Sequence, residues 1–180
     1  DVLSKFYAEK YKESYNVDLD EDVVYIGSHQ LLDTLVTFEG QEPLTVGEML
    51  LSPTRTYAPV LIDLLKNHFD KIHGLIHCSG GGQTKCMKYL PGNFRIIKDN
   101  LFTPPEIFNI IQTNSGSSNK EMYEVFNMGC RLEIYCDAAD AQIMMEAAHK
   151  FNIDAQIIGR VEAADKKELV ITAGKEIILY

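Results

Sequence analysis

Apolar residues recur along the chain with two spacings, one typical of helices and one typical of strands. Near the start they lie three or four positions apart among lysines and glutamates, which predicts a first helix with one apolar face. The residues that share this spacing are Val2, Phe6, Ala8, Tyr11 and Tyr15. After the acidic turn 18–22, Val23–Ile26 is a candidate strand, and 27–43 is poorly periodic and expected to be mostly loop.

Two helices are predicted before the middle of the chain. Thr45 precedes the first, which runs through Leu51, and Glu48 stands three residues later as in a capping box. Pro53 is expected to open the second at its first turn, because proline is tolerated there, and the pattern continues to Phe69.

Strands and helices alternate after this point, which predicts a layered α/β or α+β domain with a mixed sheet. The predicted strands are Gly74–Ser79, Phe94–Ile97, Arg131–Cys136, Ala155–Val161, Glu168–Thr172 and Lys175–Tyr180, and the predicted helices are Gln83–Tyr89, Pro104–Gln112, Asn119–Phe126 and Asp137–Phe151. SNKE, residues 118–121, is a second capping-box pattern, at the start of the helix that runs through Phe126. We expect a domain over 43–180, preceded by an N-terminal helix and connecting arm over 1–42.

Composition and charge narrow the class of protein. The chain has 180 residues, of which 46% are hydrophobic, and this content excludes dominant disorder. Its net charge of −9, without a stripe of lysine and arginine, argues against a nucleic-acid partner. No apolar run is long enough to cross a membrane, and four cysteines without CxxC spacing suggest reduced thiols in a cytoplasmic protein.

The strongest local candidate for chemistry is HCSGGG, residues 77–82. Gly80, Gly81 and Gly82 follow a strand and precede a helix, so their main-chain N–H groups are open to a phosphate. Ser79 and His77 lie just before them, where an imidazole can exchange a proton or contact a phosphate oxygen. The alternatives are an ordinary tight turn and a structural histidine at a strand end.

Two further motifs hold candidate residues. In SPTRTY, Thr54 and Arg55 would lie in the first turn of the helix opened by Pro53 and could contact an oxyanion. In FNMGC, Asn127 and Gly129 lie between a helix and a strand, where both residue types readily end a helix. By itself the second motif indicates a helix cap rather than a site. No metal-ligating cluster is evident.

Taken in order, these motifs resemble one family. PLTVGEMLLSPTRTY, GLIHCSGGG, EMYEVFNMG and IIGRVE look like the C-terminal half of aminoimidazole ribonucleotide synthetase, also called phosphoribosylformylglycinamidine cyclo-ligase. The resemblance extends from about Pro43 to Val170, and the usual APTR and HxTGGG appear here as SPTR and HCSGGG.

The resemblance implies a fold, a reaction and partners. It implies a three-layer α/β/α domain of partly ferredoxin-like topology, in an enzyme that closes the imidazole ring of a purine precursor with ATP. ATP and Mg²⁺ would be held mainly by an N-terminal half that precedes this chain, and that half would also build a homodimer. The chain alone would then be inactive, with the N-terminal half and a ribonucleotide substrate as its partners.

The resemblance also implies roles for individual residues. His77 would act in proton transfer or phosphate contact, and Ser79 with Gly80–Gly82 would hold the substrate phosphate. Thr54 and Arg55 would face the cleft as further phosphate-binding residues, and Asn127 and Gly129 would shape its wall. Two alternatives stay open: a related enzyme of the formylglycinamidine ribonucleotide synthetase, selenophosphate synthetase or thiamine-phosphate kinase type, and a stand-alone phosphate-binding module.

Overall fold

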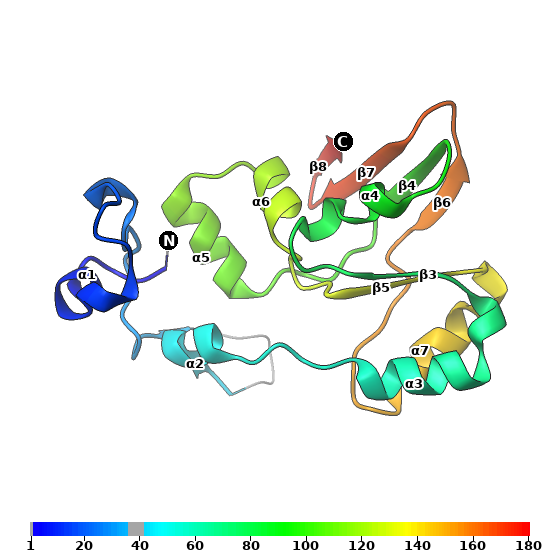
Figure 1. The fold of residues 1–180 in the computed structure, drawn as a ribbon, viewed down its shortest axis with the longest axis horizontal. Coiled ribbons are helices and arrows are strands. Elements are labelled where there is room, and N and C mark those ends of the chain that lie inside the picture. Colours follow the sequence, from blue (N-terminus) through cyan, green and yellow to red (C-terminus); the bar gives the residue numbers. More distant parts are fainter. Residues whose placement is uncertain (1, 36–41) are drawn as a thin grey trace. The chain divides into compact units, whose positions relative to one another are not determined.

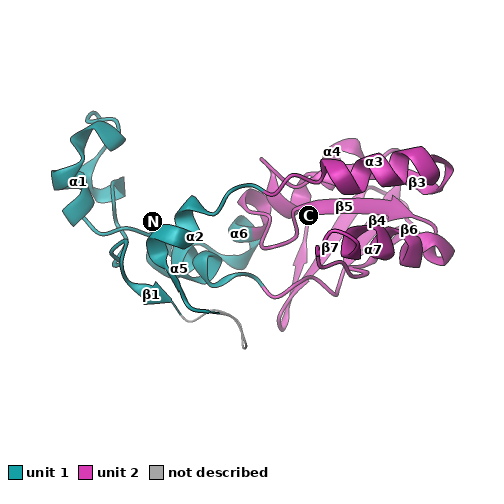
Figure 2. Ribbon diagram, turned by 90° about the horizontal axis from the view of Figure 1, so that it is seen from below, with its two compact units in different colours: residues 1–54, 104–122 teal, residues 55–103, 123–180 magenta. Residues whose placement is uncertain are grey.

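The chain forms two compact units, each built from two separate stretches of sequence (Figure 2). The computed structural model describes residues 2–35 and 42–180, so part of the loop expected over 27–43 lies outside the described residues. The first unit comprises residues 1–54 and 104–122, and the second comprises 55–103 and 123–180.

The first unit is mainly helical. Its core joins Val2, Val46 and Ile110, which come from both of its stretches. Its elements are α1 (Phe6–Lys10), η1 (Lys12–Ser14), η2 (Glu21–Val23), β1 (Thr34–Leu35), β2 (Leu44–Thr45), α2 (Val46–Leu51) and α5 (Glu106–Ser115) (Figure 1). The pair β1–β2 is antiparallel.

Two predictions near the N-terminus are wrong. The first helix is only α1, because Tyr11 leaves the helical conformation and its carbonyl accepts a hydrogen bond from Ser14 Oγ at 2.6 Å. The expected strand over Val23–Ile26 is absent from this described segment. Instead the side chain of Asp20 caps the short helix η2, and Tyr25 has a φ of 50°, which is incompatible with an extended strand.

The capping boxes predicted from the sequence are confirmed. Thr45 accepts a hydrogen bond from the main chain of Glu48, whose side chain in turn accepts one from the main chain of Thr45. Ser118 and Glu121 make the same pair of bonds at the start of α6 (Asn119–Val125). These side chains supply partners for main-chain groups that a helix start leaves without partners.

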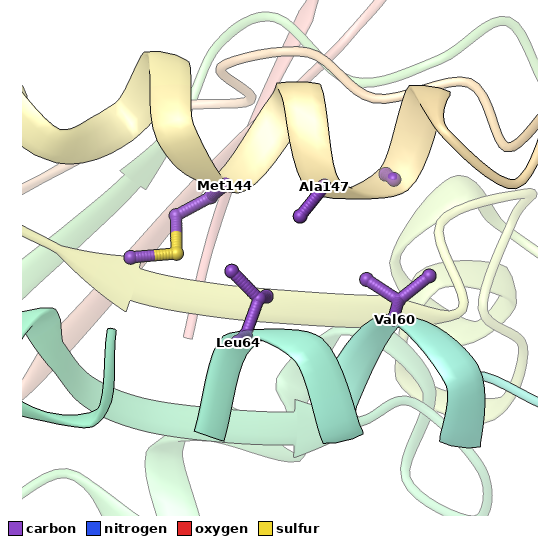
Figure 3. Packing of buried hydrophobic residues seen from close by; sticks show 5 residues of the cluster. Val60, Leu64, Met144 and Ala147 are labelled. Carbon is purple, nitrogen blue, oxygen red and sulfur yellow. The ribbon is translucent and has the colours of Figure 1, made fainter. Parts of the chain in front are cut away.

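The second unit contains β3 (Ile72–His77) and β5 (Leu132–Cys136), paired antiparallel. Helices α3 (Ala58–Asn67) and α7 (Ala141–His149) pack on these two strands. Two short helices lie beside them in sequence: η3 (Phe69–Lys71) precedes β3, and η5 (Ala138–Asp140) precedes α7. The side chains between the two helices are Val60, Leu64, Met144, Ala147 and Ala148 (Figure 3). Ile72 and Ile134 of the strands pack against this cluster.

Helix α3 begins later than its sequence predicts. We expected Pro53 to open it, but residues 52–57 are not helical and Pro59 occupies the first turn instead. Proline is compatible with the first turn of a helix, so the local pattern allowed a start at either proline. The start at Ala58 is the one that places Val60 and Leu64 in the core.

A four-stranded mixed sheet completes the second unit, in the order β6-β4-β7-β8. Strand β4 (Phe94–Lys98) pairs parallel with β7 (Glu168–Ala173) and antiparallel with β6 (Arg160–Ala163), and β7 pairs antiparallel with β8 (Glu176–Leu179). This confirms the predicted α/β class with a mixed sheet, while a three-layer arrangement stays a prediction.

Strand β6 is shorter than the predicted Ala155–Val161. Side-chain and main-chain groups of Asn100 bond the carbonyls of Ile157 and Ile158, so these residues do not join the strand ladder. At Gly159 an added Cβ would lie only 1.8 Å from the carbonyl oxygen of Ile97. The glycine therefore permits the close approach at which β6 begins.

No helix among the described residues is long and apolar enough to cross a membrane.

Candidate functional site

The three glycines after β3 adopt a conformation that other residues rarely reach. Gly80, Gly81 and Gly82 have φ angles of 43°, 92° and 47°. Within the described parts of the chain, no group accepts a hydrogen bond from their three main-chain N–H groups. Consecutive N–H groups in such a turn form a concave donor surface for an anion.

The glycines differ in what surrounds them. A Cβ at Gly82 would lie 2.4 Å from the carbonyl oxygen of Phe126 and 2.7 Å from that of Tyr123. A Cβ at Gly80 would meet nothing within 4 Å. Gly82 therefore packs the loop against the rest of the unit, whereas Gly80 and Gly81 are exposed and accessible to a ligand.

The helix expected over Gln83–Tyr89 is split in two. The short helix η4 (Gly82–Thr84) follows the glycines directly, and α4 (Cys86–Tyr89) has only four residues. An element this short contributes little helix dipole, because that field needs several aligned turns. The positive potential of the loop must therefore come from its own amides and from side chains.

Lys85 supplies such a side chain, and the sequence interpretation missed it. Its Nζ donates to the carbonyl oxygen of Ser79 at 2.9 Å and lies 3.4 Å from Ser79 Oγ, so the ammonium bridges the loop. Among the described residues it has no carboxylate within ion-pair distance. Its place three residues after Gly82, in GGGQTK, was the signal that could have identified it.

His77 ends β3 with an exposed side chain. Its ring contacts that of Tyr57 edge-on, with ring centroids 6.2 Å apart. Burial raises the pKa of Tyr57, while the charges of Arg131 and Arg55 oppose that increase. An exposed imidazole, a protonated phenol and two guanidinium groups thus lie near the strand end from which the glycine loop departs.

The structure corrects the position of the SPTR residues. Because α3 begins at Ala58, Thr54 and Arg55 do not lie in a helical first turn. Arg55 donates to the carbonyl of Asn152 at 3.3 Å within the second unit. Thr54 is the last residue of the first stretch of the first unit, whereas every other predicted site residue lies in the second unit.

The FNMG turn contacts the glycine loop through its main chain. Asn127 Oδ1 accepts from the N–H of Gly129 at 2.9 Å, and Met128 and Gly129 have positive φ angles of 50° and 97°. The side chain of Gln83 donates to the carbonyl oxygens of Asn127 at 2.6 Å and Cys130 at 3.0 Å. Two motifs that are 44 residues apart in sequence are thereby joined.

A buried ion pair lies behind this junction, and it too was missed. Lys98 Nζ is 2.5 Å from Glu133 Oε1, with the two side chains 1% and 3% exposed. In the strand that contains RLEIYC, the polar side chain of Glu133 is therefore directed into the interior. Burial lowers the pKa of Lys98, but the Glu133 carboxylate outweighs this and raises the pKa above its usual value.

The cysteines do not provide a nucleophile. Burial raises the pKa of Cys130 to about 12, and burial together with the Glu133 charge raises the pKa of Cys78 further. Both thiols are therefore protonated at neutral pH, and the thiolate is the reactive form. The arrangement is suited to binding an oxyanion and moving a proton, not to covalent thiol chemistry.

Comparison with known proteins identifies the family. The family model described as "AIR synthase related protein, C-terminal domain" matches residues 24–172. Phosphoribosylformylglycinamidine cyclo-ligases of Methanocaldococcus jannaschii and Methanobrevibacter smithii are each 35% identical, over 76% and 74% of this chain. That of Pseudothermotoga lettingae is 34% identical over 70% of the chain.

These matches cover only part of each relative. The chain spans 39%, 38% and 37% of the length of the three cyclo-ligases, respectively. The matched region includes β3, the glycine loop, the FNMG turn and most of the four-stranded sheet. The chain belongs to the family of AIR synthase related proteins, as their C-terminal domain.

Proposed function

We propose that this chain is the C-terminal part of a phosphoribosylformylglycinamidine cyclo-ligase and that its glycine loop binds the phosphate of the ribonucleotide substrate. One observation carries the proposal: the N–H groups of Gly80, Gly81 and Gly82 have no acceptor within the described chain, and Lys85 bridges the same loop. The name shared by the relatives, phosphoribosylformylglycinamidine cyclo-ligase, supports this reaction and with it a role in purine biosynthesis.

In the proposed reaction an amine of the substrate attacks its formyl amide carbon and closes an imidazole ring, while the formyl oxygen, which ATP would activate by phosphorylation, leaves as phosphate. Such a step needs orientation of the substrate and a proton acceptor more than a covalent nucleophile. The glycine loop and Lys85 grip the phosphate, which is remote from the reacting atoms, so that binding energy orients the ring-forming end. His77, exposed at the end of β3, accepts the proton that the amine loses.

ATP supplies the activation of the formyl oxygen when it is bound. Among residues 2–35 and 42–180, no group of three or more histidine, cysteine, aspartate or glutamate side chains could hold a metal ion. No step through Mg²⁺ is assigned to residues of this chain. We assign ATP, Mg²⁺ and the homodimer contact to the remaining length of the cyclo-ligase, and we place the protein in the cytoplasm.

The proposal is tested by titrating the ¹⁵N-labelled chain with ribose 5-phosphate. Saturable shifts of the Gly80, Gly81 and Gly82 amide signals are expected. In Lys85→Met the affinity for ribose 5-phosphate should fall about tenfold, because one charge-assisted contact to the phosphate is lost. Lys88→Met is the matched control, since Lys88 is exposed and contacts the ring of Tyr89 instead. Unchanged glycine signals at saturating ligand would refute the assignment. Micromolar binding of ATP to this chain alone would favour a stand-alone nucleotide module.

A further inference from the structure

The run of three glycines needs an external support to keep one conformation. Glycine has the widest conformational freedom of any residue, so three in succession resist ordering by their own geometry. Lys85 contacts Ser79 at the exposed side of the loop, and Lys85 itself belongs to the loop's continuation. Besides the packing of Gly82 against Phe126 and Tyr123, the loop is held by the buried residues at its two ends, Cys78 and Gln83.

Cys78, the residue that precedes the loop, is 2% exposed. Its N–H donates to the carbonyl of Arg131 at 2.8 Å, and its Sγ lies 3.2 Å from Glu133 Oε1. The start of the loop is thus attached to β5 by one main-chain bond and one side-chain bond.

Gln83, the residue that follows the loop, is fully buried. Lys98 Nζ donates to its main-chain oxygen at 2.7 Å and to its Oε1 at 3.1 Å, and its Nε2 donates to two carbonyls of the FNMG turn. Because ammonium groups only donate and carbonyls only accept, these partners allow one orientation of the side-chain amide. All its amide hydrogens and its oxygen are used.

Both ends of the loop meet at one carboxylate. Glu133 Oε1 accepts hydrogen bonds from Cys78 Sγ and Lys98 Nζ, and Glu133 Oε2 accepts one from the hydroxyl of Tyr135 at 2.7 Å. Only Ser79 and the three glycines span the distance between the two attached residues. A loop this short has far fewer accessible conformations when both of its ends are fixed than when they are free.

A buried ion pair is not required for stability as such. Replacing one with neutral groups of similar shape is often neutral or stabilising, because burying charge is costly. Here the Lys98 ammonium donates to three acceptors: the Glu133 carboxylate, the Gln83 main-chain oxygen and the Gln83 side-chain oxygen all converge on it. Such convergence suits a positioning role.

We propose that Lys98, Glu133 and Gln83 form a positioning network that holds the Gly80–Gly82 amides in their anion-binding conformation. The network touches neither substrate nor reacting atoms, so its members are positioning residues rather than catalytic ones. That the anion is a ribonucleotide phosphate rests on the proposed function. The effect of the network on the conformation of the loop is independent of the proposed function.

The test uses neutral, similarly sized replacements in the whole chain. In Lys98→Met/Glu133→Gln the charges are removed, while the new amide can still accept from Tyr135. Gln83→Met removes only the side-chain amide. The control is Arg95→Met/Glu168→Gln, which makes the same change in a partly exposed ion pair that joins β4 to β7, with N–O distance 2.7 Å.

The first measurement needs no ligand. The chain has 12 glycines, so selective ¹⁵N-glycine labelling gives a simple spectrum in which Gly80–Gly82 can be followed. We expect their signals to broaden or shift toward random-coil positions in both network variants, with circular dichroism and cooperative unfolding retained. The control should leave them in place. Unchanged signals of the three glycines in a folded double variant and in folded Gln83→Met would overturn the positioning role.

The second measurement separates this inference from the proposed function. Affinity for ribose 5-phosphate should fall about tenfold or more in the network variants, as misplacement of positioning groups does elsewhere, and stay within twofold in the control. If the parent chain does not bind ribose 5-phosphate but its glycine signals respond to the network variants, the ligand assignment fails and the positioning role stands. If the parent binds and the folded variants bind equally well, the positioning role fails.

Discussion

At the scale of single residues, neighbouring glycines of the glycine loop have different structural roles. Gly82 is buried against the carbonyls of Phe126 and Tyr123, whereas Gly80 faces open space with a similar positive φ. In the sequence the three glycines look equivalent, and it predicts only the conformational freedom that they share. It does not show which glycine packs against residues more than 40 positions away, because that depends on the FNMG turn.

The two glycines should therefore respond differently to the same substitution. Gly80→Ala should cost about 1–2 kcal/mol of unfolding free energy, the penalty for a left-handed conformation with a Cβ. Gly82→Ala adds a clash with two carbonyls and should cost more than about 4 kcal/mol. Urea unfolding of both variants measures the difference. Equal costs would mean that the loop does not pack as described.

The buried thiols make stability depend on alkaline pH. Burial raises the pKa of Cys130 to about 12, while a cysteine in the unfolded chain has its ordinary pKa of 9.0. A group whose pKa is raised in the folded state contributes stability that is complete below the unfolded pKa and is lost above it. Unfolding free energy should therefore fall from pH 9 toward pH 12, by about 1.4 kcal/mol per pH unit for each such thiol.

Urea unfolding at several pH values checks this dependence. Cys130→Ala should make the decline above pH 9 shallower than in the parent chain, by the contribution of one thiol. A decline of equal slope in the two proteins would show that Cys130 does not ionise differently in the folded and unfolded chains.

At the scale of elements, local signals located most helices and strands but misplaced several boundaries. The capping boxes at Thr45 and Ser118 are local, because the side chain and its main-chain partner lie within one turn, and both are confirmed. The start of α3 depends instead on which residues reach the core shared with α7. Pro53 and Pro59 carry the same local signal, so tertiary packing decided between them.

The packing of α3 against α7 (Figure 3) can be tested by comparing Leu64 with its neighbour Leu65. Leu64 is 0% exposed and belongs to the shared core, whereas Leu65 is 42% exposed. Leu64→Ala should lower the unfolding free energy by about 2–5 kcal/mol, because it leaves a cavity among well-packed side chains. Leu65→Ala should change it by less than about 1 kcal/mol. Thermal or urea unfolding of the pair would show the difference, and similar costs would refute the assigned core.

At the scale of the whole molecule, the motifs predicted the family and the class of fold, but not the contacts that join the site. His77, the glycines and Asn127 could be selected from the sequence because each lies in a recognisable local pattern. Lys98 and Glu133 could not, since a lysine in a strand and a glutamate in an alternating strand are ordinary surface residues by composition. Only their convergence in space gives them a role.

The catalytic assignment of His77 requires a cyclo-ligase that contains this chain. We expect His77→Ala to lower kcat by about 10²–10⁴-fold, the usual contribution of a general base or acid. His73→Ala is the matched control: His73 is on the same strand, exposed, and paired with Asp137 at 3.4 Å. It should leave kcat within twofold. If the two variants have similar kcat values, His77 has no part in proton transfer.

Each of the two units is interrupted by the other along the chain, and this affects how the protein is made on the ribosome. Strand β3 is synthesised well before its partner β5, and residues 104–122 of the first unit emerge between them. The nascent second unit therefore holds an unpaired apolar strand edge until translation passes Cys136, a period in which chaperone protection is most valuable. Slowing the ribosome with rare codons just after Met122 should prolong that exposure and increase the insoluble fraction.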